Sequence, residues 1–295
     1  MASSFDFDLF VIGGGSGGVR AARMAAQRGA SVALAETLGT DGLGGTCVNV
    51  GCIPKKLYSY AAHYADGFEE SHGFGWEGER PSLNWGTLKA NRAKEISRLN
   101  GVYSGLLTGS GVTVLNGFAR LEGEHAITLA TLNADGSPGH QRFTAKNVLI
   151  ATGGHFRAAF QRARTRDHVQ RGLRSRSVSQ PLSGGRGGYI ACEFASIFNG
   201  LGAQVTQLYR GEQVLRGFDT EIRHFVAGEM RKSGVDLRLN ADVVDVRKAA
   251  DGRMWSARAA TWWWSMRCFT PPVACPMCRA WGWRRWVWPK VARAR

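Results

Sequence analysis

The stretch GTCVNVGCIPKK, residues 45–56, places two cysteines five positions apart and is the part of the sequence best suited to chemistry. In an ideal α-helix, residues five apart are separated by about 7.5 Å along the helix axis. A disulfide needs a Cα separation of roughly 4.4–6.8 Å, so a bond between Cys47 and Cys52 requires a distorted turn. Gly51 permits such a turn, because glycine adopts backbone conformations that other residues avoid. Distorted disulfides tend to be labile or catalytic, which predicts a redox role for the pair.

A structural staple and a zinc site are the alternatives for these two cysteines. The chain has six cysteines in 295 residues, far below the density of a disulfide-stabilised scaffold. A staple closing so short a loop would add little stability to a large domain. Zinc needs further ligands, and no second Cys or His pair follows at a suitable spacing. The sequence therefore favours a redox pair and predicts no metal site.

A nucleotide-binding unit directly precedes the cysteines and is expected to position them. The apolar run Leu9–Ile12 predicts a buried strand, a helix rich in Ala and Arg follows, and a second strand over residues 31–35 ends in Glu36. In the dinucleotide-binding fingerprint, one glycine makes the tight turn, one lets the pyrophosphate approach, and one allows helix–strand packing. The helix N-terminus attracts the phosphates, and the acid binds the ribose hydroxyls. The three glycines with this spacing are Gly13, Gly15 and Gly18.

This combination resembles the pyridine nucleotide-disulfide oxidoreductases of class I, flavoproteins with two dinucleotide sites. Within the family, the stretch GGTCVNVGCIPKK is most similar to the glutathione reductases of bacterial type. The lysine pair at residues 55–56 favours glutathione or thioredoxin reductases over dihydrolipoamide dehydrogenases. The resemblance covers residues 1–154 and resumes at 187–250. It implies an α/β fold with two Rossmann-like dinucleotide-binding units in a three-layer arrangement of sheet and helices.

The resemblance implies that the first site binds FAD. One group of residues would hold its pyrophosphate, ribose and flavin: Gly13, Gly15, Ser16, Gly18, Glu36, Gly45 and Thr46. The strand AKNVLIATGG matches the family's crossover out of the FAD domain. Thr152 and Gly153, at its end, are expected beside the cofactor.

The family also implies roles in catalysis and substrate binding. Cys52 would lie next to the flavin, and Cys47 would attack the substrate disulfide. Lys55 would lie near the reactive edge of the flavin, where a cation stabilises a thiolate and a reduced, anionic flavin. Glu193 would pair with Lys55. The residues expected to contact glutathione are Ser16, Arg23 and Tyr103.

Residues 187–219 resemble the nicotinamide-binding unit of the family. A helix would present Ile190, Phe194, Ile197 and Phe198 on one face, and the segment AQVTQLY would form the next strand. Tyr189 would be the flap that moves when the nicotinamide arrives. An acid after this strand would repel a 2′-phosphate, but here Arg210 follows it and Arg216 lies six residues on. Because arginine suits bidentate phosphate contacts, NADPH is expected rather than NADH.

The family pattern breaks on both sides of this second unit. Arg186 stands where the family has the first glycine of its turn, and VSQPLSGG replaces the apolar strand before it. We therefore expect a damaged turn and a sheet that lacks one strand. After residue 252, neither a later FAD contact nor the C-terminal dimer domain, with its acid–base His–Glu pair, is recognisable. The homodimer expected of an intact member would lack its interface, and little or no turnover is expected from this chain.

The net charge of +15 would ordinarily suggest a nucleic-acid or membrane-surface partner. The excess is concentrated in residues 157–186, with eight arginines and one acid, and in residues 253–295, with nine Lys or Arg and no acid. Eight of the ten tryptophans lie between Trp255 and Trp288. Because both segments fall where the family pattern breaks, their composition favours a shifted reading frame. Neither nucleic acid nor membrane is therefore an expected partner, and the Cys275–Cys278 pair is assigned no role.

Four segments follow from these patterns: an FAD-binding domain over 1–154, an aberrant basic segment over 155–186, a partial NADPH-binding domain over 187–252 and an aberrant tail over 253–295. No apolar run approaches a membrane span and residues 1–8 do not read as a secretory signal, so a cytoplasmic location is expected. The expected function is NADPH-dependent reduction of glutathione disulfide through FAD, in thiol redox homeostasis. A thioredoxin or mercuric reductase, a non-catalytic FAD-binding fragment and a nucleic-acid-binding protein are the alternatives.

Overall fold

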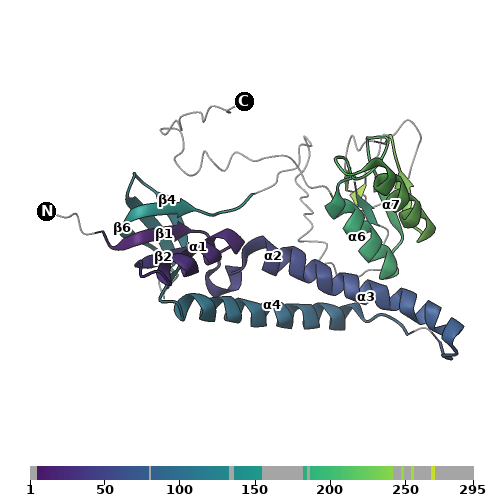
Figure 1. The fold of residues 1–295 in the computed structure, drawn as a ribbon, viewed down its shortest axis with the longest axis horizontal. Coiled ribbons are helices and arrows are strands. Elements are labelled where there is room, and N and C mark those ends of the chain that lie inside the picture. Colours follow the sequence, from purple (N-terminus) through teal and green to yellow (C-terminus); the bar gives the residue numbers. More distant parts are fainter. Residues whose placement is uncertain are drawn as a thin grey trace. The chain divides into compact units, whose positions relative to one another are not determined.

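The computed structural model describes residues 5–79, 81–132, 136–154 and 187–241, together with four short strands at 182–184, 247–248, 254–255 and 267–269 (Figure 1). Two compact units are present. Among the described residues, the first comprises 5–51 and 95–154, and the second comprises 52–94 and 182–269. Arg186, most of the basic segment and most of the tail, including Cys275 and Cys278, lie outside the described residues.

The first unit is built on a six-stranded sheet with the order β3-β2-β1-β6-β5-β4. The four strands β3, β2, β1 and β6 are parallel where they pair, and β4 and β5 extend the sheet as antiparallel neighbours. The strands are β1 (Phe7–Ile12), β2 (Val32–Glu36), β3 (Thr113–Asn116), β4 (Phe118–Leu121), β5 (Ala126–Leu132) and β6 (Pro138–Ile150). Its helices are α1 (Ser16–Ala26), the 3-10 turn η1 (Gly39–Gly42), α2 (Gly45–Val50) and the later part of α4 (Trp85–Thr108).

The strands β1 and β2 lie inside this sheet, and most of their residues are apolar on both faces. Phe10, Val11 and Leu34 are fully buried, as expected for parallel strands covered on both sides. α1 lies against both strands (Figure 1). It buries Val19 and Ala22 in the core that they share. The strand–helix–strand unit expected at residues 9–36 is therefore present, and it brings the glycine-rich turn to the carboxyl end of β1.

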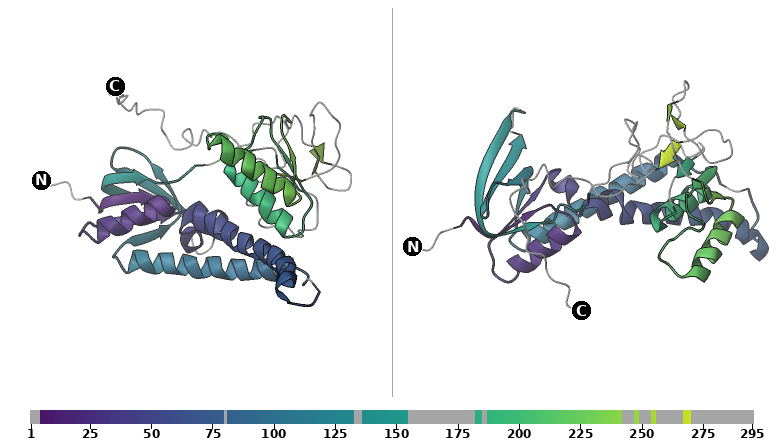
Figure 2. Two further views of the ribbon diagram at one scale, coloured as in Figure 1. Left: turned by 45° about the vertical axis from the view of Figure 1, so that its right-hand side comes forward. Right: turned by 90° about the horizontal axis from the view of Figure 1, so that it is seen from above.

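The second unit has a four-stranded sheet with the order β12-β7-β8-β9, and every pairing in it is parallel. α6 (Tyr189–Gly200) and α7 (Thr220–Lys232) pack against this sheet (Figure 2). The strands are β7 (Leu182–Gly184), β8 (Val205–Leu208), β9 (Asp236–Arg238) and β12 (Arg267–Phe269). The unit also contains α3 (Cys52–Ser71), η2 (His72–Phe74), the start of α4, and a separate antiparallel pair, β10 (Arg247–Lys248) and β11 (Met254–Trp255).

A single apolar core joins α3 to the second sheet. Tyr58, fully buried in α3, stacks at a tilt on Trp85 with ring centroids 5.1 Å apart. A Cβ on Gly200 of α6 would come within 3.0 Å of the Ala62 side chain, so the two helices approach closely there. Ile197 and Phe198 are buried in this core as expected, whereas Ile190 is 37% exposed. The helix that begins at Cys52 is thus packed against the helix that follows the second glycine turn.

The expectation that the second sheet would lack a strand before its glycine turn is wrong. Leu182–Gly184 form β7, which pairs with β8 from Leu182↔Val205 to Gly184↔Gln207. The apolar pattern that the expectation required is absent, but strand pairing depends on backbone hydrogen bonds, which any sequence without a badly placed proline can supply.

Candidate redox and nucleotide sites

The two cysteines lie on different helices, and the break between the helices falls at Gly51. Cys47 is half-buried within α2, and Cys52 is exposed as the first residue of α3. Gly51 has φ −129° and ψ −115°, and a Cβ there would lie 2.7 Å from the carbonyl oxygen of Thr46. The distorted glycine turn that the spacing predicted is therefore present. A disulfide between Cys47 and Cys52 stays a prediction.

The first glycine turn leaves no space for a side chain at two of its three fingerprint glycines, Gly13 and Gly18. Gly13 has φ +109°, and a Cβ on it would lie 2.6 Å from the carbonyl oxygen of Ala151. A Cβ on Gly18 would lie 1.9 Å from the carbonyl oxygen of Gly13. At Gly15, which caps α1, the nearest atom to a Cβ is 3.7 Å away. Helix α1 and strand β1 therefore pack tightly through Gly13 and Gly18, whereas the backbone at Gly15 remains accessible. A dinucleotide pyrophosphate requires this combination, because it approaches the backbone N–H groups at the start of the helix.

Glu36 lies beside this turn at the end of β2. Its carboxylate accepts a hydrogen bond of 2.7 Å from the backbone N–H of Gly14. Gly44 donates to the carbonyl oxygen of Gly14 at 2.8 Å, so the loop before α2 is also joined to the turn. A carboxylate at this position can accept hydrogen bonds from ribose hydroxyls.

The remaining residues assigned to the first site lie at the ends of its elements. Ser16 and Thr46 are exposed in the first turns of α1 and α2, and Gly45 begins α2. Thr152 and Gly153 are exposed after β6, where Gly153 has φ +70°. The residues of the first unit thus fit FAD, and their individual contacts with it stay predictions.

Two asparagines that sequence reasoning missed hold the loop before α2. The Asn49 amide group lies within hydrogen-bond distance of the carbonyl oxygens of Gly42, Leu43 and Gly45, at 2.9–3.3 Å. Asn100, on α4, donates to Leu43 at 2.8 Å and to the side-chain oxygen of Asn49 at 3.1 Å. Asn100 is only 4% exposed. Its signal in the sequence is weak, because an asparagine in a helix is ordinarily a solvent-facing residue.

Lys55 and Glu193 form the ion pair that the family resemblance implied. Lys55 Nζ donates to Glu193 Oε1 at 2.6 Å, and the side chains are 27% and 38% exposed. Lys55 lies in the first turn of α3, three residues after Cys52, and Glu193 lies on α6. Two residues 138 positions apart in the chain therefore form an ion pair one helical turn from Cys52, at the start of α3.

The second glycine turn leads into α6 and has cationic surroundings. Gly188 caps the helix, no atom lies within 4 Å of a Cβ built on it, and Tyr189 is 56% exposed. Arg210 and Arg216 are exposed on the loop after β8, and neither pairs with a carboxylate of the residues that the structure describes. An open helix N-terminus and two available guanidinium groups fit a nucleotide with an additional phosphate.

The residues expected to contact glutathione lie on two helices of the first unit. Arg23 is half-buried in α1, and Tyr103 is half-buried in α4 against the core that includes Val19 and Leu107. Their roles in substrate binding stay predictions.

No group of three or more His, Cys, Asp or Glu side chains among the described residues could hold a metal ion. None of the described helices is long and apolar enough to cross a membrane.

Comparisons with known proteins agree with this arrangement. The family model described as pyridine nucleotide-disulphide oxidoreductase matches residues 7–260. The chain is 46% identical over 266 residues to the glutathione reductase of Burkholderia cepacia, covering 83% of this chain and 52% of the relative. It is 41% identical to the chloroplastic/mitochondrial glutathione reductase of Pisum sativum, covering 86% and 46%, and 36% identical to the trypanothione reductase of Leishmania donovani, covering 83% and 53%.

A solved structure shares the fold. The Cu(II) complex of the HOCl-induced flavoprotein disulfide reductase RclA from Escherichia coli matches with a TM-score of 0.78 at 22% identity, covering 93% of this chain and 58% of that one. The chain spans about half the length of the curated relatives it matches. Because the family model matches most of its length, the chain belongs to the pyridine nucleotide-disulphide oxidoreductases, a family in which the glutathione reductases use FAD and NADPH.

Proposed function

We propose that this chain carries the FAD-binding and NADPH-binding parts of a cytoplasmic glutathione-disulfide reductase, whose intact form would be a homodimer. The observation that carries the proposal is the Lys55–Glu193 ion pair. It ties the helix that begins at Cys52 to the helix that follows the second glycine turn. A chain that only bound a nucleotide would have no need to join these two helices through a charge pair.

The two cysteines would perform the disulfide exchange. The Cys47 thiolate would attack one sulfur of glutathione disulfide, forming a mixed disulfide and releasing one glutathione as thiolate. The Cys52 thiolate would then attack the Cys47 sulfur, releasing the second glutathione and forming the Cys47–Cys52 disulfide. The substrate gains the two electrons that the cysteine pair loses. FAD, when bound, would supply the route by which a hydride from NADPH returns those two electrons to the cysteines.

Other residues would prepare this chemistry. Lys55, held by Glu193, would keep a positive charge close to the cysteine helix, where it stabilises a thiolate. Tyr189, exposed at the start of α6, is free to change its rotamer when a nicotinamide arrives. Arg210 and Arg216 would select NADPH by its 2′-phosphate.

The role of the ion pair can be tested with Lys55→Met. Loss of the charge should slow bleaching of the bound flavin by NADPH at least about tenfold, the scale on which placed charges affect catalysis, while leaving the FAD content unchanged. Lys56→Met is the matched control, because the adjacent Lys56 points its ammonium group at the Tyr60 ring, 5.1 Å from the centroid, and not at Glu193. Equal bleaching rates in the two variants would contradict the proposal.

The substrate can be tested separately by offering glutathione disulfide, trypanothione disulfide and oxidised thioredoxin to the NADPH-reduced protein. Preferential oxidation by glutathione disulfide is expected. A yellow protein whose flavin is not bleached by NADPH would instead favour the non-catalytic FAD-binding fragment.

A further inference from the structure

The loop between β8 and α7 carries both exposed arginines of the second site, and several hydrogen bonds fix its path. At its start, Tyr209 accepts a backbone hydrogen bond from Ala241, and Gly211 accepts one from Asn240. At its end, the backbone N–H of Leu215 donates to the carbonyl oxygen of Gly187 at 2.5 Å. The loop is therefore closed onto the second glycine turn immediately before Arg216.

Arg223, on α7, holds the middle of this loop. Its Nε donates to the carbonyl oxygen of Val214 at 2.8 Å, and its Nη2 donates to that of Gln213 at 2.9 Å. The guanidinium is half-buried, and Val214 is fully buried. One planar group thus fixes two consecutive peptide groups, which a lysine ammonium cannot do with the same geometry.

Leu215 follows the two residues that Arg223 holds, and its backbone conformation sets the direction of the chain at Arg216. Leu215 has φ +57°, in the left-handed region that a residue with a branched side chain seldom adopts. Hydrogen bonds hold it there: Arg223 binds the preceding Val214 carbonyl, the Leu215 N–H donates to Gly187, and the Leu215 carbonyl accepts from the Phe218 N–H at 3.0 Å. Without Arg223, Leu215 would lose one of the constraints that keep this conformation.

We propose that Arg223 is a positioning residue for recognition of the 2′-phosphate. It fixes the loop so that Arg210 and Arg216 converge on one phosphate, and it thereby contributes to selection of NADPH over NADH. Both donors that it uses point at backbone carbonyls, so it acts through the other two arginines. This inference rests on the proposed NADPH site and extends it to a residue one helical turn inside α7.

The test measures nucleotide binding alone and requires no turnover. Adenosine 2′,5′-bisphosphate and adenosine 5′-monophosphate differ only by the 2′-phosphate. Calorimetric titration of the full chain with each gives the ratio of their affinities. We expect the wild-type chain to prefer the bisphosphate, and Arg223→Met to reduce that preference about tenfold, the effect of losing one charge-assisted hydrogen bond. Affinity for the monophosphate should stay the same.

A lysine at position 223 separates positioning from simple attraction. Arg223→Lys keeps the positive charge but cannot hold both carbonyl oxygens, so it should lose the preference nearly as fully as Arg223→Met. Full preference in Arg223→Lys would overturn the inference. Arg216→Met should reduce the preference at least as much as Arg223→Met. Adding Arg223→Met to it should change little, because Arg223 would act largely through Arg216.

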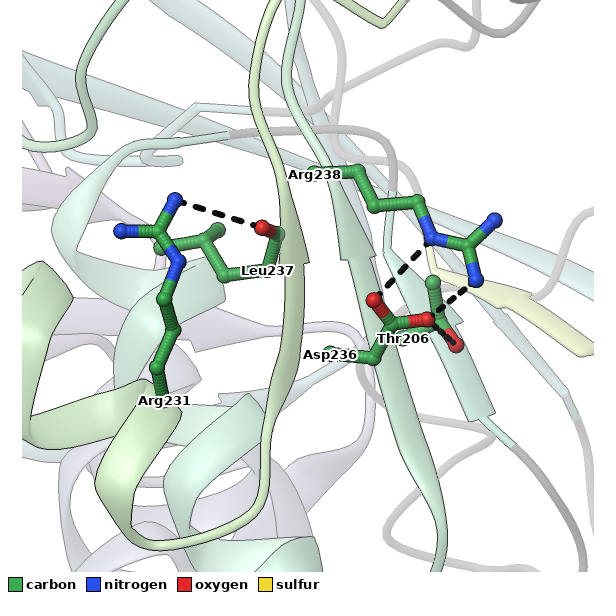
Figure 3. A network of polar contacts seen from close by, with 5 residues as sticks. All are labelled: Thr206, Arg231, Asp236, Leu237 and Arg238. Carbon is green, nitrogen blue, oxygen red and sulfur yellow. Dashed lines mark hydrogen bonds and ion pairs between the residues drawn. The ribbon is translucent and has the colours of Figure 1, made fainter. Parts of the chain in front are cut away.

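Arg231 provides the matched control on the same helix. It also donates from α7 to a backbone carbonyl, that of Leu237, at 3.4 Å (Figure 3). The neighbouring Thr206, Asp236 and Arg238 form a separate group of hydrogen bonds across β8 and β9. Arg231→Met should keep the preference. Hydrogen exchange at the Leu215 amide gives a second readout, which should accelerate in Arg223→Met and not in Arg231→Met.

The outcomes distinguish the inference from the function on which it rests. If the wild-type chain shows no preference for the bisphosphate, the NADPH site itself is refuted. If Arg216→Met loses the preference while Arg223→Met, folded by circular dichroism, retains it, the NADPH site stands and the role of Arg223 is refuted.

Discussion

The two glycine turns of this chain open similar helices but are stabilised in different ways. The first is closed by the glycines themselves, since Gly18 packs directly on the backbone of Gly13, and it is joined to the carboxylate of Glu36. The second is closed by a loop that carries Arg210 and Arg216 and is held by Arg223. The same supersecondary element thus has a carboxylate beside it in one case and two exposed guanidinium groups in the other.

The comparison suggests where each turn tolerates change. In the first turn the closest contacts, at Gly13 and Gly18, are with backbone atoms, which cannot move without shifting a strand or a helix. In the second, several contacts involve side chains, which can rotate away. We therefore expect substitutions in the first turn to affect stability most, and substitutions in the second turn to affect nucleotide selection most.

The largest effect is expected from Gly18→Ala. The new Cβ would lie 1.9 Å from the Gly13 carbonyl oxygen, so α1 would have to move away from β1. This should lower the free energy of unfolding by about 3 kcal/mol or more and release FAD. Urea unfolding and bound FAD per chain measure both effects. Gly17→Ala is the control, because its Cβ would meet no atom within 4 Å, and the two variants should therefore behave very differently.

A smaller effect is expected from Asn100→Leu. The substitution keeps the approximate volume but leaves the Leu43 carbonyl and the Asn49 side-chain oxygen without this donor. The cost should be about 1–3 kcal/mol, with weaker retention of FAD, because the loop before α2 loosens. Asn147→Leu removes a comparable bond, from an exposed asparagine to the Asp8 carbonyl, and should cost less than half as much. Equal costs would argue against a special role for the buried asparagine.

In the second turn, Gly187→Ala tests whether side-chain contacts yield. The new Cβ would lie 2.5 Å from the Tyr209 ring, which can rotate, so a loss of about 1–2 kcal/mol is expected, less than for Gly18→Ala. In a double-mutant cycle, Tyr209→Ala should remove most of the penalty caused by the alanine. A penalty that persists without the ring would show that the backbone, as in the first turn, sets the limit.

The smallest effect concerns pH and the strands beside the first turn. The backbone N–H and hydroxyl of Ser31 hold the pKa of Asp8 below its ordinary value of 3.8, and Thr144 lowers the pKa of Asp6 in the same way. A lowered carboxyl pKa stabilises the folded state above the unfolded pKa, and this contribution is lost as the pH falls through the folded pKa. Protection of β1 and β2 from hydrogen exchange, measured relative to the intrinsic exchange rate at each pH, should therefore fall below about pH 4, where unfolded aspartate gains a proton. Asp8→Asn should weaken that loss of protection.

Sequence reasoning identified the residues that act locally and missed those that act across the fold. The glycines, Glu36 and the break at Gly51 follow from spacing, because their function depends on neighbours within one strand–turn–helix unit. The Lys55–Glu193 pair was expected only because the family resemblance implied it. Asn49, Asn100 and Arg223 bind backbone carbonyls, which every residue possesses, so no side-chain pattern marks their partners. Strand β7 was wrongly excluded for a related reason, since its pairing does not require apolar residues.

Cys192 shows how the core of the second unit keeps a structural thiol from reacting. It lies next to Glu193 on α6 but is buried in the core, 5% exposed, with the Gln207 amide 3.5 Å from its sulfur. Burial raises the pKa of the Cys192 thiol, so it remains protonated and sheltered where Cys52 is exposed. A protein that handles disulfides must keep its own structural thiols from exchanging with them. Burial in this core, one residue away from the ion pair, makes the Cys192 thiol chemically inert. Labelling at neutral pH should therefore modify Cys52 and leave Cys192 unmodified.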